Sequence, residues 1–491
     1  MSKRSFLSGM LLMLSFTAVV GQAVKTTAKP AAATSGYHIP ITLSPYKNVQ
    51  IYLGSYYGKS KTIVDSAVLN EQSKGIFKGI KKLTPGIYFV ISPKYSILFE
   101  VLMDDKQHFS IESDTLKLDK TAIIGSVEND LFKTYSQFSI TKGKELQQLS
   151  AQYSKATNKA DSLRLQAELI KGNKVLQDYR NNFCKQHPNT LLATIFNAMK
   201  QPDAPAIPIV KGKPDSTYPY RFVKEHYWDD IGFNDDRLLR TPFFETKVDD
   251  YYKRLVVQHP DSLYKEIKYM LLMARTGKEM FPYLLTKFTN KYINPEIMGH
   301  DKVFLKIFED FYAKGDTTYL NPASRKTISD RYYSLMANQL GNPAPELILT
   351  DTVGNSVSLY KIKSKYTFIS FWDPTCGHCK EEIPRLDSIY KARWKKLGVT
   401  VFSVNANEAK MDEYKKFITD KKLSADWLFA YQTKAARDAE QKANVPNYRQ
   451  LYDMYKTPTF YLLDENKRII AKQLSIEQFN DLLSAKQNKP Q

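Results

Sequence analysis

The chain has 491 residues, too many for a single hydrophobic core, and a length of about 150 residues per domain predicts about three domains. Hydrophobic residues make up 43% and charged residues 25% of the chain, as in ordinary soluble globular proteins. The net charge is +20, but the lysines are spread along the whole chain. This spread disfavours a nucleic-acid-binding stripe and favours a generally basic, solvated surface.

Residues 1–23 are typical of an export signal. A short basic segment at residues 2–4 precedes an apolar segment at residues 6–20, and Gly21-Gln22-Ala23 supplies the small residues that a signal peptidase requires. We therefore expect cleavage after Ala23. The alternative is an uncleaved anchor, although the apolar segment is shorter than the roughly 20 residues that span a membrane. No cysteine near the cleavage site supports a lipid anchor.

The next segments predict a linker and two domains. Residues 24–36 are rich in Ala, Thr, Lys and Pro, which indicates a flexible linker. Over residues 37–125, short segments of β-branched and aromatic residues alternate with turn residues, which predicts a small antiparallel β-sandwich or barrel. The apolar period then becomes helical, and residues 126–340 are predicted to form an all-α domain. Its first two long helices are expected over residues 128–150 and 161–184.

Residues 341–491 alternate strand and helix. Predicted strands over residues 366–372 and 399–405 flank a helix over residues 376–395, which makes a β-α-β unit. Further elements are a helix over residues 409–421, strands over residues 459–463 and 468–472, and a closing helix from residue 475 to about 485. This order predicts an α/β sandwich with a central mixed sheet.

The chain has three cysteines, and two of them form a C-x-x-C pair. Cys376 lies where a strand is predicted to turn into a helix, and a thiolate at a helix N-terminus is stabilised by the unpaired backbone N–H groups. Cys379, one turn later, can resolve the mixed disulfide that Cys376 forms. Zinc would need two further ligands with matching spacing. Cys184 is the only other cysteine and the seven histidines show no paired spacing, so a redox couple without metal or organic cofactor is favoured.

Cys184 itself follows a helical apolar pattern in the second long predicted helix. We interpret it as a buried or half-buried packing residue. A second redox role is the alternative.

Residues from about 342 to 485 resemble a thioredoxin-fold domain of the TlpA/ResA type. The resemblance is carried by Trp372-x-x-x-Cys376-x-x-Cys379, Lys380, Pro384 and Thr457-Pro458 before a strand. It implies that Pro458 is the family's cis-proline beside the dithiol and that the backbone of Thr457 pairs with an extended substrate segment. Trp372, Thr457 and Pro458 are therefore the expected substrate-binding residues.

The resemblance also assigns a proton carrier. Glu382 matches a glutamate of the subgroup's active-site helix, one turn after Cys379, where it could exchange a proton with the resolving thiol. Thioredoxin carries a buried acid six residues before its first cysteine, but Ser370 occupies that position here. The proton transfer therefore falls to Glu382, with a solvated surface glutamate as the alternative.

His378 occupies the position where thioredoxin has proline, and the Cys-Gly-His-Cys loop resembles the active site of protein disulfide isomerase. An imidazolium there would stabilise the thiolate, lower the pKa of Cys376 and raise the reduction potential. The alternative is a solvated turn residue without such an effect. Peroxiredoxins share the fold class, but their P-x-x-x-[ST]-x-x-C motif is not matched around Cys376, so that function is rejected.

The two upstream domains resemble, more loosely, the uncharacterised β and helical domains that accompany TlpA-like modules in Gram-negative envelope proteins, notably of the Bacteroidetes. The signals are residues 124–129 at the junction of the two domains and residues 236–242. No function follows from this resemblance.

Together these observations predict an exported, periplasmic thiol–disulfide oxidoreductase in which Cys376 attacks and Cys379 resolves. Its expected partners are envelope proteins that contain disulfides or dithiols, and a membrane electron donor if it acts as a reductant. Whether it reduces or isomerises disulfides stays open, because a TlpA-like module usually reduces whereas His378 favours a more oxidising couple. The alternative is a binding or scaffold protein whose upstream domains dock a partner, with a secondary thioredoxin module.

Overall fold

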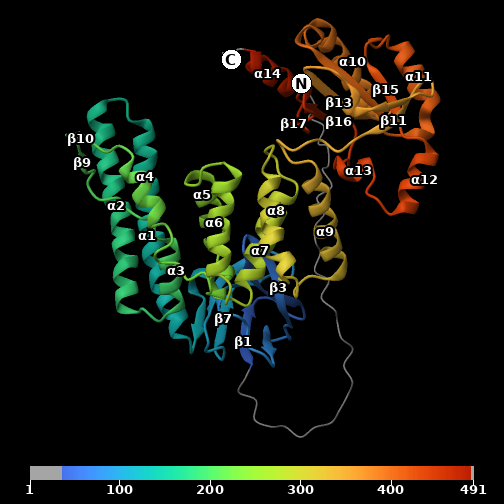
Figure 1. Cartoon of the computed structure of the whole chain (residues 1–491). Helices are drawn as coiled ribbons and strands as arrows, with labels where there is room; N and C mark the ends of the chain where they lie inside the picture. The colour runs from blue at the N-terminus through green and yellow to red at the C-terminus, as the bar shows by residue number, and fades with distance from the viewer. Residues whose placement is uncertain (1–35, 488–491) are drawn as a thin grey trace, which may run out of the picture.

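The computed structural model describes residues 36–487, which form a β-rich, a helical and an α/β domain in chain order (Figure 1). This architecture confirms the predicted fold class. The predicted signal peptide and nearly all of the predicted linker lie outside the described residues. None of the helices within the described part of the chain is long and apolar enough to cross a membrane.

The N-terminal domain consists of two four-stranded sheets, ordered β4-β1-β7-β8 and β3-β2-β5-β6. The strands are β1 (Tyr37–Ser44), β2 (Gln50–Tyr57), β3 (Ser60–Val68), β4 (Lys74–Gly79), β5 (Gly86–Ile91), β6 (Ile97–Met103), β7 (Ser110–Asp114) and β8 (Ala122–Ile124). Alternate residues of both sheets, such as Ile39 and Phe77 in one and Leu53 and Val90 in the other, share one core.

The sequence predicted a purely antiparallel sandwich, and this part of the prediction is wrong. β1 and β7 pair in parallel, with Ile41 opposite Ile111. The reason is that the chain changes sheets between β6 and β7, so that β7 returns beside β1 in the same direction. Such long-range pairing leaves no local signal in the sequence.

The central domain is helical. Its helices are α1 (Val127–Lys155), α2 (Lys159–Gln186), α3 (Leu191–Met199), α4 (Tyr218–Glu225), α5 (Phe244–Arg254), α6 (Pro260–Met273), α7 (Met280–Ile293), α8 (Asp301–Asp310) and α9 (Pro322–Ala337). The two long predicted helices are confirmed as α1 and α2, which begin after the capping side chains of Ser126 and Asn158. They form a hairpin that stands apart from α5–α9 (Figure 1). A two-strand ribbon of β9 (Ile209–Val210) and β10 (Lys213–Pro214) interrupts the helices.

The C-terminal domain is built on a seven-stranded mixed sheet, ordered β12-β11-β15-β14-β13-β16-β17. Its strands are β11 (Ile348–Asp351), β12 (Ser356–Ser358), β13 (Tyr366–Trp372), β14 (Val399–Asn405), β15 (Leu428–Tyr431), β16 (Thr459–Leu463) and β17 (Ile469–Lys472). Its helices are α10 (Gly377–Ala392), α11 (Met411–Asp420), α12 (Lys434–Ala443), α13 (Tyr448–Leu451) and α14 (Ile476–Gln487). The predicted mixed sheet is confirmed, and β13 lies between parallel β14 and antiparallel β16.

Strand β13 divides its side chains between two cores. Phe368 and Trp372 face the core that contains residues of α10, α11 and α14. Ile369 and Phe371 face the opposite core, which contains Tyr448 of α13. A strand that is buried on both faces is fixed in position, and so is the turn that follows it.

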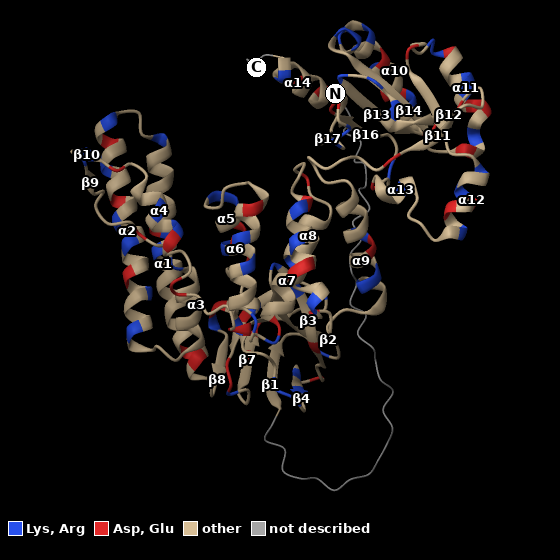
Figure 2. Ribbon diagram, viewed as in Figure 1, with Lys and Arg blue, Asp and Glu red and all other residues tan. Residues whose placement is uncertain are grey.

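Charge is distributed rather than concentrated. Figure 2 shows basic and acidic residues interspersed over all three domains of the described chain. This distribution agrees with the interpretation that the excess of lysine and arginine solvates the surface generally.

Candidate active site

The C-x-x-C pair lies at the junction of β13 and α10, as the sequence predicted. Cys376 is the N-cap residue of α10. The turn before it is held by Asp373, whose carboxylate accepts hydrogen bonds from the backbone N–H and the hydroxyl of Thr375 at 2.7 and 2.6 Å. The Cys376 N–H donates to the carbonyl of Asp373 at 3.1 Å. The first thiol is therefore placed where the free N–H groups of the helix converge.

The pKa of Cys376 lies below its ordinary value. Partial burial alone would raise this pKa, but hydrogen bonds to the thiolate from the backbone N–H groups of Cys379 and His378 and from the side chains of Thr457 and Cys379 outweigh it. Cys376 is half-buried. A stabilised and partly accessible thiolate is the property that an attacking cysteine needs.

The second thiol has the opposite character. Cys379 is fully buried, and burial raises its pKa to about 12. A hydrogen bond from the backbone N–H of Asp373 opposes this shift without cancelling it. The two cysteines are free thiols, so the pair combines an ionisable sulfur with a protonated one.

Thr457 and Pro458 lie beside the dithiol. The peptide bond between them is cis, as the resemblance implied. The Cys376 thiol donates to the carbonyl of Thr457 at 3.4 Å, and both Thr457 and Pro458 are half-buried. The structure thus brings together Cys376, Cys379, Thr457 and Pro458 from segments that are about 80 residues apart.

Trp372 occupies a different kind of position. Its side chain is fully buried, its Nε1 donates to the hydroxyl of Ser403 at 2.8 Å, and its ring packs against Tyr414 and Phe417. A protein substrate does not reach such a side chain, so the expectation that Trp372 binds substrate does not fit its burial. Its aromatic ring instead fills the core below the turn that carries the dithiol.

His378 and Glu382 lie on the outer part of α10. His378 is exposed in the first turn of the helix, where its backbone N–H faces the thiolate of Cys376. The side chain of Glu382 is 31% exposed and forms an ion pair of 3.4 Å with Arg385. The proton-transfer role of Glu382 and the electrostatic role of His378 stay predictions. Ser370, in place of the buried acid of thioredoxin, is fully buried in β13.

The sequence analysis missed Asp373. Besides holding the turn, its carboxylate accepts a hydrogen bond from Asn407 Nδ2 at 2.8 Å, which ties the turn to the end of β14. Burial raises the pKa of Asp373, but the hydrogen bonds from Thr375 and Asn407 outweigh it and hold the pKa below its ordinary value. The available signal was an acidic residue directly after a buried strand, at the edge where the carboxyl ends of parallel strands meet.

Two further sequence expectations concern residues outside this site. Cys184 is half-buried near the end of α2, its thiol donates to the carbonyl of Ala193 at 3.6 Å, and burial raises its pKa. These contacts agree with a packing residue. Within residues 36–487, no group of three or more His, Cys, Asp or Glu side chains is arranged to hold a metal ion.

The geometry defines the class of the C-terminal domain: a thioredoxin-like fold with two neighbouring free thiols at the N-terminus of its first long helix. Residues 340–472 match the AhpC/TSA family, and residues 142–338 match a domain of unknown function, DUF5106. The C-terminal domain is therefore a thioredoxin-like domain of the AhpC/TSA family, with ResA-type thiol–disulfide oxidoreductases as its relatives.

Among these relatives, the thiol–disulfide oxidoreductase ResA of Geobacillus kaustophilus is 29% identical over 157 residues, which cover 32% of this chain and 76% of the relative. ResA of Bacillus cereus is 25% identical over 134 residues, which cover 27% of this chain and 69% of the relative. A thioredoxin-like protein from Bacteroides caccae is a solved structure with 22% identity and a TM-score of 0.45, covering 58% of this chain and 99% of that chain. The solved structure of a domain of a possible thiol–disulfide isomerase from Cytophaga hutchinsonii is 38% identical, with a TM-score of 0.26. The match covers 30% of this chain and 92% of that chain.

The opposite pKa shifts predict selective alkylation of one cysteine. In a Cys184→Ser background at pH 7, iodoacetamide is expected to modify Cys376 at least tenfold faster than Cys379. Because burial raises the pKa of Cys379 to about 12 while the pKa of Cys376 is lowered, Cys376 carries by far the larger thiolate fraction at pH 7, and the lower nucleophilicity of the more acidic thiolate cancels only part of this advantage. Peptide mass mapping over a pH series measures both rates. If the pH midpoint of Cys376 alkylation lies at or above that of an unstructured thiol, or if Cys379 is labelled preferentially, the assignment of Cys376 as the more acidic thiol is contradicted.

Proposed function

We propose that this chain is an exported enzyme that exchanges disulfides with proteins of the cell envelope through Cys376 and Cys379. The single observation that carries the proposal is the asymmetry of the two thiols, one with a lowered and one with a raised pKa, beside the backbone of Thr457. Export rests on the signal-like composition of residues 1–23. The relatives named thiol–disulfide oxidoreductase ResA support the chemistry.

The exchange follows from the two thiols. The thiolate of Cys376 attacks one sulfur of a substrate disulfide, forms a mixed disulfide and releases the other substrate sulfur as a thiolate. Cys379 then loses its proton and attacks the Cys376 sulfur, which releases the second substrate thiolate. The substrate has gained two electrons, and the enzyme holds a Cys376–Cys379 disulfide. The same steps in reverse oxidise a substrate dithiol.

The remaining residues of the site support these steps. The backbone of Thr457 would pair with an extended segment of the substrate and hold its disulfide against Cys376. Glu382 would accept the proton of Cys379 and return it in the reverse direction. His378, exposed next to the attacking thiol, would favour the reduced form of the couple and so raise its reduction potential.

Substitution of the cysteines tests the proposal. The intact protein is expected to accelerate the reduction of insulin by dithiothreitol, and Cys376→Ser to abolish this activity. Cys379→Ser should instead accumulate a mixed disulfide with substrate, because the resolving thiol is missing. Cys184→Ser is the matched control and should retain full activity.

Two outcomes would defeat the enzyme function. One is a wild-type protein that does not accelerate insulin reduction, and the other is activity that survives Cys376→Ser. A complementation experiment in cells separates the enzyme from the scaffold function. If the double variant Cys376→Ser/Cys379→Ser fully restores the phenotype that is lost on gene deletion, the scaffold function is favoured, with the upstream domains acting by docking alone.

Replacement of His378 is expected to change the direction in which the couple works. His378→Gln, which keeps the backbone N–H that faces the thiolate, should lower the reduction potential by about 30 mV or more, equivalent to a tenfold change in the equilibrium with glutathione. The physical reason is the loss of the imidazole ring beside the thiolate, the group proposed to stabilise the reduced form of the couple. Equilibration against glutathione measures the potential, and Lys380→Met on the same exposed surface is the control. An unchanged potential would show that His378 is only a solvated turn residue.

Replacement of Glu382 tests proton transfer to and from the buried thiol. Glu382→Gln is expected to slow resolution of the mixed disulfide about a hundredfold at pH 7, with a smaller effect at high pH, where hydroxide removes the proton. Stopped-flow kinetics with a fluorescent disulfide peptide measures this step. Arg385→Met removes the ion-pair partner of Glu382 without the carboxylate and should leave the rate within a few-fold of wild type. Equal rates for Glu382→Gln and wild type across the pH range would assign Glu382 to the solvated surface.

A further inference from the structure

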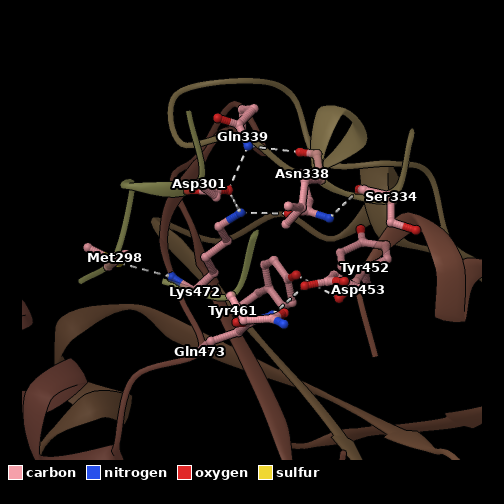
Figure 3. Close-up of polar contacts among 12 residues, drawn as sticks. Met298, Asp301, Ser334, Asn338, Gln339, Tyr452, Asp453, Tyr461, Lys472 and Gln473 are labelled. Atoms are coloured by element: carbon pink, nitrogen blue, oxygen red, sulfur yellow. Dashed lines mark hydrogen bonds and ion pairs between the residues drawn. The ribbon is translucent and has the colours of Figure 1, made fainter. Parts of the chain in front are cut away.

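The helical domain and the C-terminal domain meet through buried polar groups. Figure 3 shows Lys472, at the end of β17, directed at the carboxylate of Asp301 and the side-chain oxygen of Asn338, both at 2.6 Å. Lys472 is 5% exposed and Asp301 is 2% exposed. The amide of Gln339 donates to the same carboxylate at 2.6 Å. Because a charge at such a depth is stable only when it is paired, this network fixes the two domains relative to each other.

The same interface continues to the segment that leads into the cis peptide of the active site. The side-chain amide of Asn338 donates to the carbonyl of Leu451 at 2.9 Å. Arg331, on α9, forms an ion pair with Asp453, and its guanidinium lies 4.7 Å from the centre of the Tyr455 ring. The helical domain thus contacts this segment at three alternate positions.

The contact between Arg331 and Asp453 is buried on both sides. Arg331 is 8% exposed and Asp453 is 4% exposed. Asp453 has a left-handed backbone with φ of 51°, and its carboxylate also accepts from Gln473 Nε2 at 3.2 Å. The turn at Asp453 is therefore shaped by a side chain of another domain.

The turn is close to the reacting sulfur along the chain. Thr457 follows Asp453 by four residues, and a segment of that length spans at most about 14 Å. Its far end is held where Thr457 accepts from the Cys376 thiol and where Thr459 Oγ1 donates to the carbonyl of Lys456 at 2.6 Å. A displacement of Asp453 is transmitted to Thr457 because no long loop separates them to absorb it.

We propose that Arg331 of the helical domain is a positioning residue of the dithiol site: it fixes the turn at Asp453 and thereby holds Thr457 against Cys376 and in register for substrate. Arg331 touches neither the dithiol nor the substrate. It makes the helical domain part of the enzyme. This role rests on the proposed dithiol exchange.

The consequence of losing Arg331 follows from burial. Without the guanidinium, the carboxylate of Asp453 lacks its cationic partner and turns towards water, which releases the segment up to Thr457. The substrate strand then loses its backbone partner, and the Cys376 thiolate loses the hydrogen bond from Thr457. Binding of substrate should suffer more than the chemical step, because Cys376 and Cys379 keep their places on α10.

The test compares Arg331→Met with the wild-type full chain in exchange with a fluorescent disulfide peptide. We expect KM to rise on the order of tenfold or more while kcat changes less, and the pH midpoint of Cys376 alkylation to move upwards. Arg331→Lys restores the cation without the planar guanidinium and should recover part of the loss. Lys326→Met on the same helix, which removes the exposed ion pair with Asp330, is the matched control and should behave as wild type.

A wild-type chain without exchange activity would refute the proposed function itself. An active wild type, with an Arg331→Met variant that matches it in KM and alkylation profile, would overturn the positioning role alone. If Arg331→Met does not fold, Asp453→Asn answers the question, because it keeps the size and shape of the side chain that faces Arg331 while its charge, and with it the ion pair, is removed. That variant is expected to show a smaller rise in KM, and a KM equal to that of wild type would overturn the proposal.

Discussion

The site depends on where the apolar face of α10 begins. Cys379, Ile383, Leu386 and Tyr390 follow one another at helical spacing and are all buried in one core. Cys376 lies one turn before this face, at the N-cap, where backbone N–H groups are free. One helix therefore gives two identical side chains opposite environments. The asymmetry needed for disulfide exchange follows from packing.

The position of α10 depends in turn on β13. This strand is buried on both faces and pairs with β14 and β16, so its end is among the most constrained points of the domain. Asp373 transfers that constraint to the dithiol, because its carboxylate binds both Thr375 in the turn and Asn407 beyond β14. An attacking sulfur held in this way needs little reorganisation before it reacts.

The features that depend on local sequence patterns could be predicted from the sequence alone. The apolar run of β13, the following C-x-x-C and the helical period of α10 predicted the site, and a dipeptide motif before β16 predicted the cis-proline. The parallel pairing of β1 with β7 was not predictable, since the change of sheet leaves no periodic signal. The complete burial of Trp372 was not predictable either, because a motif position does not show whether a side chain faces substrate or core. Asp373 is not part of a recognised motif. Its hydrogen bonds with Thr375 and Asn407 were not predictable, because Asn407 is brought near Asp373 only by the pairing of β13 with β14.

Ion pairs between residues far apart in the sequence are the contacts that are hardest to predict from the sequence. Arg331 and Asp453 are more than 100 residues apart, and each belongs to a surface-like charged pattern in its own segment. Only the structure shows that the two charges are buried against each other. If Arg331 positions Thr457, the couple is controlled at two points that act differently. In the proposed function, His378 would change the electrostatic balance between thiolate and disulfide, whereas the helical domain would change how a substrate is presented to the dithiol. The first control is carried by the thioredoxin-like domain alone, and the second exists only in the multidomain chain. That difference gives a physical reason for the upstream helical domain to be joined covalently to the dithiol it helps to position.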